Sequence, residues 1–171
     1  DDMSVNKDLK NTENIYMCHK ENSVTSYDLT PMLYDMIPDI EESCAFVTSL
    51  GGGKLMFSGV TCARHSDKEA HVSTMAGGSN LFDFFTFPLI AGDPDKVLAD
   101  KGSIVISENL ANTLFPDGNA LGKEINLSET NALKGFYPEF QDMDVNLTVT
   151  GVFKPFSKTV FYEPDIIIHI D

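Results

Sequence analysis

The amino-acid sequence predicts a mixed α+β fold in which strands and helices are grouped more than they alternate. Its 171 residues, of which 42% are apolar and 22% charged, have the size and composition of one folded domain. Periodicity indicates about eight strands and about three short helices, without the regular alternation of a doubly wound sheet. A domain of this length can bury a core without disulfide or metal staples.

The N-terminal region is expected to be a polar lead-in followed by one strand and one helix. Residues 1–13 carry almost no apolar periodicity, which is typical of a solvated tether to something upstream. Residues 14–19 have the composition of a strand. A Thr-Pro pair then offers a cap and a first helical residue for a short helix over 30–40, whose far end Pro38 limits or kinks.

The next part of the chain is expected to form strands joined by tight turns. Residues 44–49 and 54–63 are strand-like, and the triple glycine 51–53 between them is typical of a turn. The polar residues 66–69 indicate a hairpin tip that leads into a strand over 71–76.

Two more helices and the remaining strands complete the expected fold. A compact helix over 79–85 is ended by Pro88, and a helix over 108–115 begins after the capping residue Ser107. The remaining strands are expected over residues 104–106, 123–127, 145–153 and 165–170.

The charge balance excludes several classes of partner. Twelve Lys and Arg against 26 Asp and Glu give a net charge of −14, and Arg64 is the only arginine. This charge repels nucleic acid and anionic lipid heads. It also argues against an enzyme that clamps phosphates with guanidinium groups. The apolar stretches 80–91 and 166–170 are too interrupted or too short to cross a bilayer.

The three cysteines, Cys18, Cys44 and Cys62, cannot all pair with one another, and their spacing matches no CxxC pattern. Each lies in an apolar run, so we expect inert core thiols in preference to a disulfide. The sequence leaves their disulfide state open.

A pattern of alternating ligand-type residues occurs at His65, Asp67, Glu69 and His71. On a single strand these four side chains would share one face and offer a reasonable zinc set, which would suit a metal-dependent hydrolase. The hairpin expected at 66–69 would instead scatter them into solvent. We therefore expect no metal site, with these four residues as the candidates should one exist.

No other motif supports catalysis or a bound cofactor. Asp142, Asp144 and Asn146 match the opening of a calcium loop, but Leu147 and Phe153 stand where glycine and glutamate are needed. The chain also lacks the spacing of a phosphate-binding loop, a nucleophile elbow and an HExxH zinc motif. We predict no catalytic residue, no cofactor and no enzymatic activity.

The densest aromatic cluster consists of Phe82, Phe84, Phe85 and Phe87. These are too many for one helical stripe, so the segment buries two faces or leaves one exposed. One interpretation is a core wedge, and the other is a docking patch for a partner protein. Both interpretations remain open at this stage.

Five short segments between His71 and Phe153 follow one another in a characteristic order and spacing. They are MAGGSNLFDFF (75–85), FPLIAG (87–92), IVISENLANTLF (104–115), NALGKEI (119–125) and TVTGVF (148–153). Together with the upstream helix and strand, they resemble the extracytoplasmic core domain of MacB-like and FtsX-like ABC transporter permeases. Each segment is architectural, as in the helix capped by Ser107 and the turn permitted by Gly122.

The resemblance implies a two-lobed domain, with one porter-like α/β-sandwich lobe and one mainly β lobe. It implies that residues 1–13 lead in from an upstream membrane helix and that residues 14–171 form the periplasmic core domain, truncated at its C-terminal end. The implied location is the periplasmic side of the cytoplasmic membrane.

The function implied by the resemblance is non-catalytic. The domain would couple cytoplasmic ATP hydrolysis to export, or to the handling of lipoproteins or peptides. The implied partners are an ABC ATPase subunit or domain, a periplasmic adaptor or substrate, and a second copy in a homodimeric transporter. The alternative is a secreted or membrane-tethered ligand-binding or sensor module, which the sequences flanking the domain in the parent gene would distinguish.

Overall fold

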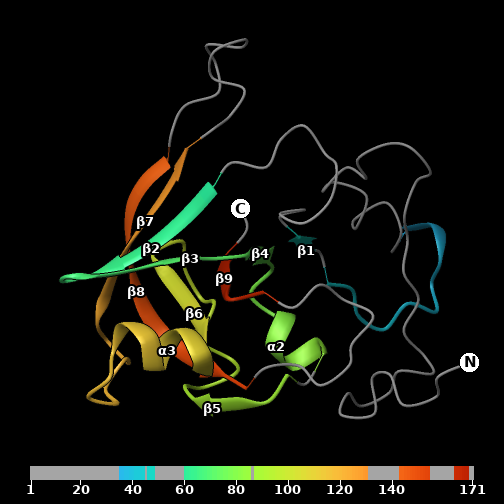
Figure 1. Ribbon diagram of the computed structural model, residues 1–171. Helices are drawn as coiled ribbons and strands as arrows, with labels where there is room; N and C mark the ends of the chain where they lie inside the picture. The colour runs from blue at the N-terminus through green and yellow to red at the C-terminus, as the bar shows by residue number, and fades with distance from the viewer. Residues whose placement is uncertain are drawn as a thin grey trace, which may run out of the picture.

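Nine strands of the computed structural model form one mixed sheet. Figure 1 shows their arrangement. The structure describes residues 35–44, 46–48, 60–85, 87–130, 143–154 and 164–169. The strand order is β1-β4-β9-β6-β8-β7-β2-β3, and β5 pairs with β8 outside this path. The strands are β1 (Phe46–Thr48), β2 (Val60–His65), β3 (Lys68–His71), β4 (Thr74–Gly77), β5 (Leu89–Ala91), β6 (Ser103–Ser107), β7 (Glu124–Thr130), β8 (Met143–Phe153) and β9 (Ile166–His169).

The sheet curls back on itself because β3 and β4 act as two halves of one bent strand. β3 pairs with β2 and β4 pairs with β9, at opposite ends of the strand order. Only Val72 and Ser73 separate the two halves, and Figure 1 shows β3 running directly toward β4. The sheet is therefore closed into a barrel-like arrangement, with β1 added outside the closure on β4.

Hydrogen bonds between Ser73 and Asp165 hold the bend in place. The Ser73 amide and hydroxyl donate to Oδ2 of Asp165 at 2.9 and 2.7 Å. The Asp165 amide lies 2.9 Å from the carbonyl oxygen of Ser73, to which it donates in return. The Asp165 carbonyl accepts from the amide of Ser107, the residue that precedes α3 (Glu108–Leu114). Asp165, which directly precedes β9, is thus hydrogen-bonded both to the bend at Ser73 and to the residue that caps α3.

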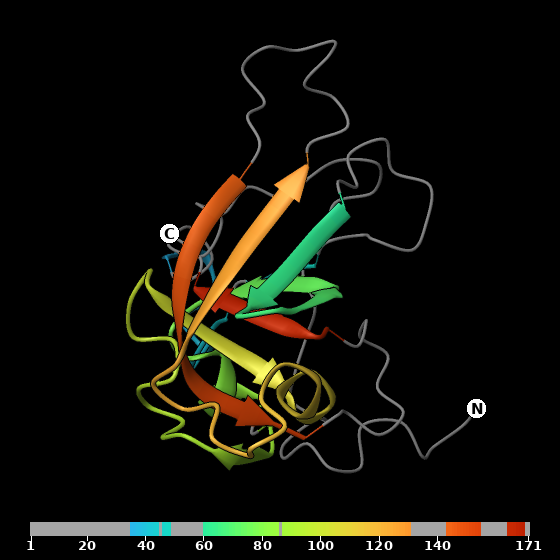
Figure 2. The ribbon, with the colours of Figure 1, turned by 60° about the vertical axis from the view of Figure 1, so that its left-hand side comes forward.

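Helix α3 covers one face of the curled sheet. Ser107 caps it, because its hydroxyl accepts from the Leu110 amide at 3.2 Å. Figure 2 shows this helix nearly end-on beside β6. The apolar cluster on this side, which includes both helical and strand residues, comprises Ala63, Ile104, Ile106, Leu110, Leu114, Phe115, Ala120, Ile125, Leu127, Leu147, Val149, Val152 and Ile166.

The short helix α2 (Leu81–Phe84) belongs to a second apolar cluster on the other face of β6 and β9. Strand alternation divides the two clusters, since Val105 and Ile167 point to the α2 side while Ile104 and Ile166 point to the α3 side. The second cluster comprises Met75, Leu81, Phe82, Phe85, Phe87, Val97, Leu98, Val105, Phe153 and Ile167. The sheet therefore has a core on each face at this end.

The structure confirms the α+β class and most of the expected elements. The strands expected over 44–49, 104–106, 123–127, 145–153 and 165–170 are observed as β1, β6, β7, β8 and β9. The helices expected over 79–85 and 108–115 are observed as α2 and α3. Ser66 and Asp67 form the turn of the expected hairpin, and Ser66 adopts a positive φ of 54° there.

Two expectations differ from the observed elements. The strand expected over 71–76 is broken at Val72 and Ser73, because the chain bends there to close the sheet. Strand β5, which follows Pro88, was not among the expected strands. Of the described strands, β5 pairs only with β8, so it lies at an edge of the sheet. A neighbouring proline, which has no amide to donate, is tolerated at such an edge.

Several expected features fall wholly or partly outside the described residues. These are the lead-in, the strand over 14–19, the turn at 51–53, the start of the strand over 54–63, and most of the helix over 30–40, of which Asp35 and Met36 are helical. In the part of the chain that is described, no helix combines the length and apolar character that a bilayer crossing requires.

We predict that Phe82→Ala lowers the free energy of unfolding by about 3–5 kcal/mol, because it opens a cavity in the α2-side cluster. Phe82 is 1% exposed and makes an edge contact with Phe87 at a centroid distance of 5.9 Å. Urea unfolding followed by circular dichroism measures the change. Phe84→Ala, at a half-buried position on the same helix, is the matched control and should cost clearly less. Equal costs for the two variants would contradict this assignment of the core.

We predict that Asp165→Ala lowers the free energy of unfolding by about 2 kcal/mol, because the amide and hydroxyl of the half-buried Ser73 lose a charged acceptor. The control is Asp93→Ala, which removes an exposed carboxylate paired with Lys96 across one turn. Thermal unfolding should separate the two variants clearly. A melting temperature of Asp165→Ala equal to that of Asp93→Ala would show that the bend does not depend on this contact.

Candidate functional site

The four candidate metal ligands do not share a face of the β2–β3 hairpin. His65 is opposite Lys68, whereas Arg64 is opposite Glu69 and Cys62 is opposite His71. Side chains alternate along each strand, so Glu69 and His71 lie on one face and His65 lies on the other. Asp67 lies in the turn between the strands. The single-strand arrangement that would gather all four is therefore not present.

Contacts of the individual side chains explain this separation. The His65 ring packs on Phe115 at a centroid distance of 4.4 Å, and its Nδ1 lies 2.8 Å from the Glu124 carbonyl oxygen. Since a carbonyl only accepts, Nδ1 of His65 carries the proton. Glu69 pairs with Arg64, and their hydrogen bond and opposite charges lower the pKa of the Glu69 carboxyl. Over the described ranges, no three His, Cys, Asp or Glu side chains form a metal-binding group.

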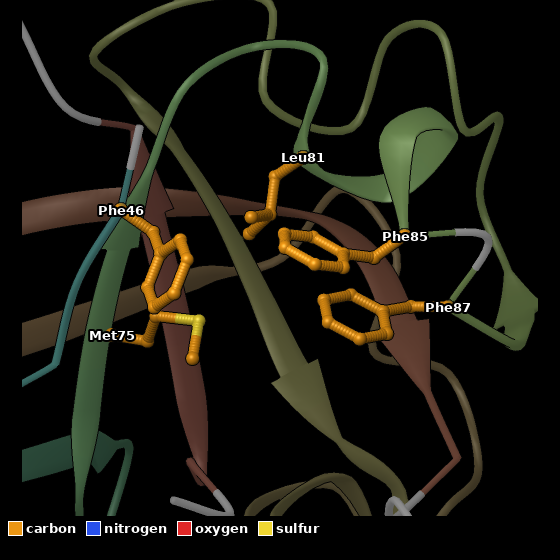
Figure 3. A pocket seen from close by; sticks show the side chains of 5 residues that line it. All are labelled: Phe46, Met75, Leu81, Phe85 and Phe87. Atoms are coloured by element: carbon orange, nitrogen blue, oxygen red, sulfur yellow. The ribbon is translucent and has the colours of Figure 1, made fainter. Parts of the chain in front are cut away.

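Most of the aromatic cluster is buried in the apolar core on the α2 side of the sheet, as the core-wedge interpretation expects. Phe82, Phe85 and Phe87 are at most 5% exposed, and only Phe84 is half-buried. Figure 3 shows Phe85 and Phe87 stacked, with centroids 5.2 Å apart, beside Phe46 and Met75. The hollow that these side chains line with Leu81 is too small to hold a water molecule. The docking-patch interpretation is therefore corrected for the three buried rings, which offer no surface to a partner.

The residues that opened the calcium-loop pattern lie in a strand, except Asp142, which is outside the described residues. Asp144 and Asn146 are exposed on β8, and both accept hydrogen bonds from Nδ2 of Asn126, at 2.7 and 3.0 Å. Their oxygens therefore belong to a cross-strand ladder rather than to an ion-binding loop.

These side chains form part of a larger surface, which we call the polar face. It is the outer side of β3, β2, β7 and the first half of β8, and strand register places its members directly opposite one another. Its members are Cys62, Arg64, Glu69, His71, Asn126, Ser128, Asp144 and Asn146. The inner side of the same strands carries Ala63, Leu127 and Leu147, which belong to the α3-side core.

Arg64, the only arginine of the chain, lies at the centre of the polar face. Its Nε donates to Glu69 and its Nη1 donates to Ser128 at 3.0 Å, so it links three strands. Glu69 and Asp144 keep the surface acidic around it. The face therefore offers exposed donors and acceptors in a fixed pattern, which suits recognition of another molecule better than catalysis.

Sequence reasoning missed the polar face, although the signal was present. In the run Glu124–Ser128 polar and apolar residues alternate strictly, which predicts a strand with one solvated side. The partner strands could not be named from sequence, because their pairing depends on contacts distant along the chain.

The structure brings Cys62 and His71 together, a pair that sequence reasoning did not identify. Sγ of Cys62 lies 3.1 Å from Nδ1 of His71 across the hairpin. Cys62 is buried, as expected, and Cys44 is half-buried. Burial, helped by the charge of Glu42, raises the pKa of the Cys44 thiol to about 12. Cys18 is outside the described residues.

Comparison with known proteins identifies the family. The family model of the MacB-like periplasmic core domain matches residues 3–171. A domain of a putative permease from Porphyromonas gingivalis is 25% identical, with a TM-score of 0.56 over 82% of this chain and 55% of that one. The extracellular domain of the noncanonical ABC-type transporter YknZ from Gram-positive bacteria is 15% identical, with a TM-score of 0.53 over 88% of this chain and 64% of that one.

The chain thus spans 55% and 64% of the two solved domains that it resembles. No curated protein sequence gives a significant match. The family model covers nearly the whole chain and agrees with the mixed α+β fold and with the extracytoplasmic setting expected from the sequence. The chain therefore belongs to the MacB-like periplasmic core domain family, as an extracytoplasmic domain of an ABC transporter permease.

Proposed function

We propose that this domain is a non-catalytic relay, which passes movements of the membrane part of the transporter to a periplasmic adaptor or substrate. ATP hydrolysis by a cytoplasmic ATPase subunit or domain would drive those movements. The transporter would contain two copies of the domain, and its task would be export or the handling of lipoproteins or peptides.

The observation that carries this proposal is where the chain enters and leaves the sheet. Phe46, the first residue of β1, and His169, the last residue of β9, are both in register with Gly77 of β4. The two positions flank β4 at the same end and are therefore about 10 Å apart. Segments that precede β1 and follow β9 would act on a single end of the sheet.

The closed sheet supports transmission of such a movement. Strands that are hydrogen-bonded around a closure, with packed apolar clusters on both faces, resist internal deformation. A push at the β1 and β9 end would therefore rotate the domain as a unit. The polar face, with Arg64 at its centre, is the surface that we assign to the adaptor or substrate.

The test uses the intact transporter with its ATPase, reconstituted in lipid nanodiscs. Spin labels placed at Asp67→Cys, in the exposed hairpin turn, report the distance between the two copies. We expect this distance to change by several ångströms between the nucleotide-free and the vanadate-trapped ATP states. Electron–electron double resonance measures it in a background in which the native cysteines are replaced by serine.

Two controls make the result decisive. Labels at Asp67→Cys and Asp117→Cys within one copy, diluted with unlabelled protein, should keep a constant distance if the domain moves as a unit. Replacing the phosphate-binding lysine of the ATPase should abolish the change between copies. An unchanged distance between copies in the two nucleotide states would refute the relay, and the absence of any signal between copies would refute the homodimer.

A further inference from the structure

The pair formed by Cys62 and His71 lies within the polar face and combines a thiol with an imidazole, a chemistry that the relay function does not require. The two residues are directly opposite each other on β2 and β3, so both side chains project from the same face. Sγ of Cys62 lies 3.1 Å from Nδ1 of His71. Cys62 is 8% exposed, whereas His71 is exposed, so the pair can be reached from the histidine side.

The backbone around the pair is fixed on both sides. β2 is hydrogen-bonded to β3 on one edge and to β7 on the other, and Cys62 is also opposite Ser128. A ligand bound between sulfur and nitrogen would therefore meet two donors whose strands are already in place. No folding of a loop would be needed to form the site.

The charged neighbours of the pair balance one another. Arg64 lies on the same face, and its hydrogen bond to Glu69 and the charge of that carboxylate raise the pKa of Arg64. Glu69 balances this cation through its hydrogen bond, so a bound cation would not face an unpaired guanidinium.

The number of ligands decides the class of ion. Structural zinc sites need four protein ligands and catalytic ones three, and within the described part of the chain no third His, Cys, Asp or Glu completes such a group. Soft monovalent cations commonly bind only two ligands, in a linear geometry, and they prefer sulfur and imidazole ligands. Two metal–ligand bonds of about 2.0–2.3 Å each would require the donor atoms to separate by about 1 Å from their present distance.

We propose that Cys62 and His71 form a two-coordinate site for a soft monovalent cation of the Cu(I) or Ag(I) class. On binding, the Cys62 thiol releases its proton to solvent and a sulfur–metal bond forms. Neutral His71 donates the lone pair of Nδ1, and its remaining ring proton resides on Nε2. No electron is transferred, and no further reactant is needed.

Titration of the 171-residue chain with silver nitrate in chloride-free buffer tests the site. Cys18→Ser and Cys44→Ser in the background leave Cys62 as the only thiol. We expect one Ag⁺ per chain by equilibrium dialysis, none after Cys62→Ser, and at least a tenfold weaker affinity after His71→Ala. His65→Ala is the matched control, since His65 lies on the same hairpin but on the opposite face, and it should leave the affinity unchanged.

A second measurement uses the unsubstituted pair and so does not depend on the folding of a variant. In ¹H–¹⁵N spectra of the imidazole rings, the Nδ1 resonance of His71 should shift with one equivalent of Ag⁺, while that of His65 should not. The proposal is overturned if the His71 resonances stay in place, if His71→Ala binds Ag⁺ as tightly as the parent, or if Cys62→Ser retains the ion.

Discussion

The contact between Asp165 and Ser73 joins the bend in the sheet to the segment that leads into β9. A carboxylate that accepts from both the amide and the hydroxyl of Ser73 fixes the break between β3 and β4. The same residue directly precedes β9, and its carbonyl accepts from the amide of Ser107, the cap of α3. At this junction the strand bends, so that β3 pairs with β2 while β4 pairs with β9. The bend that closes the sheet and the start of its main helix are thus hydrogen-bonded to the same residue.

Closure also explains why the domain has a core on two sides at one end and a solvated face at the other. In β6 and β9 the side chains on both faces of the sheet are apolar. In β6, for example, Ile104 belongs to the cluster on one face and Val105 to the cluster on the other. In β7 only one set is apolar, so Ile125 and Leu127 point inward while Asn126 and Ser128 point outward. The polar face is therefore a direct consequence of binary patterning on a curved sheet.

Local signals in the sequence were sufficient for the elements but not for their association. The capping pattern at Ser107, the alternation in 145–153 and the polar tip at 66–69 each predict an element that is observed. The break at Val72 and Ser73 could not be predicted, because the residue to which Ser73 is hydrogen-bonded there, Asp165, is distant in the chain. The pairing of Cys62 with His71 was missed for the same reason, since it needs the register of the hairpin. The four phenylalanines of 82–87 left two interpretations open until burial distinguished them.

The position of Arg64 connects recognition with stability in a domain of net charge −14. A single guanidinium that bonds to Glu69 and Ser128 spans β3, β2 and β7 on an otherwise acidic surface. Because the pair with Glu69 is exposed, it adds little to the free energy of folding. Its greater effect is to hold the donors and acceptors of the polar face in one arrangement. A partner that binds there meets a preformed pattern, and this lowers the entropic cost of association.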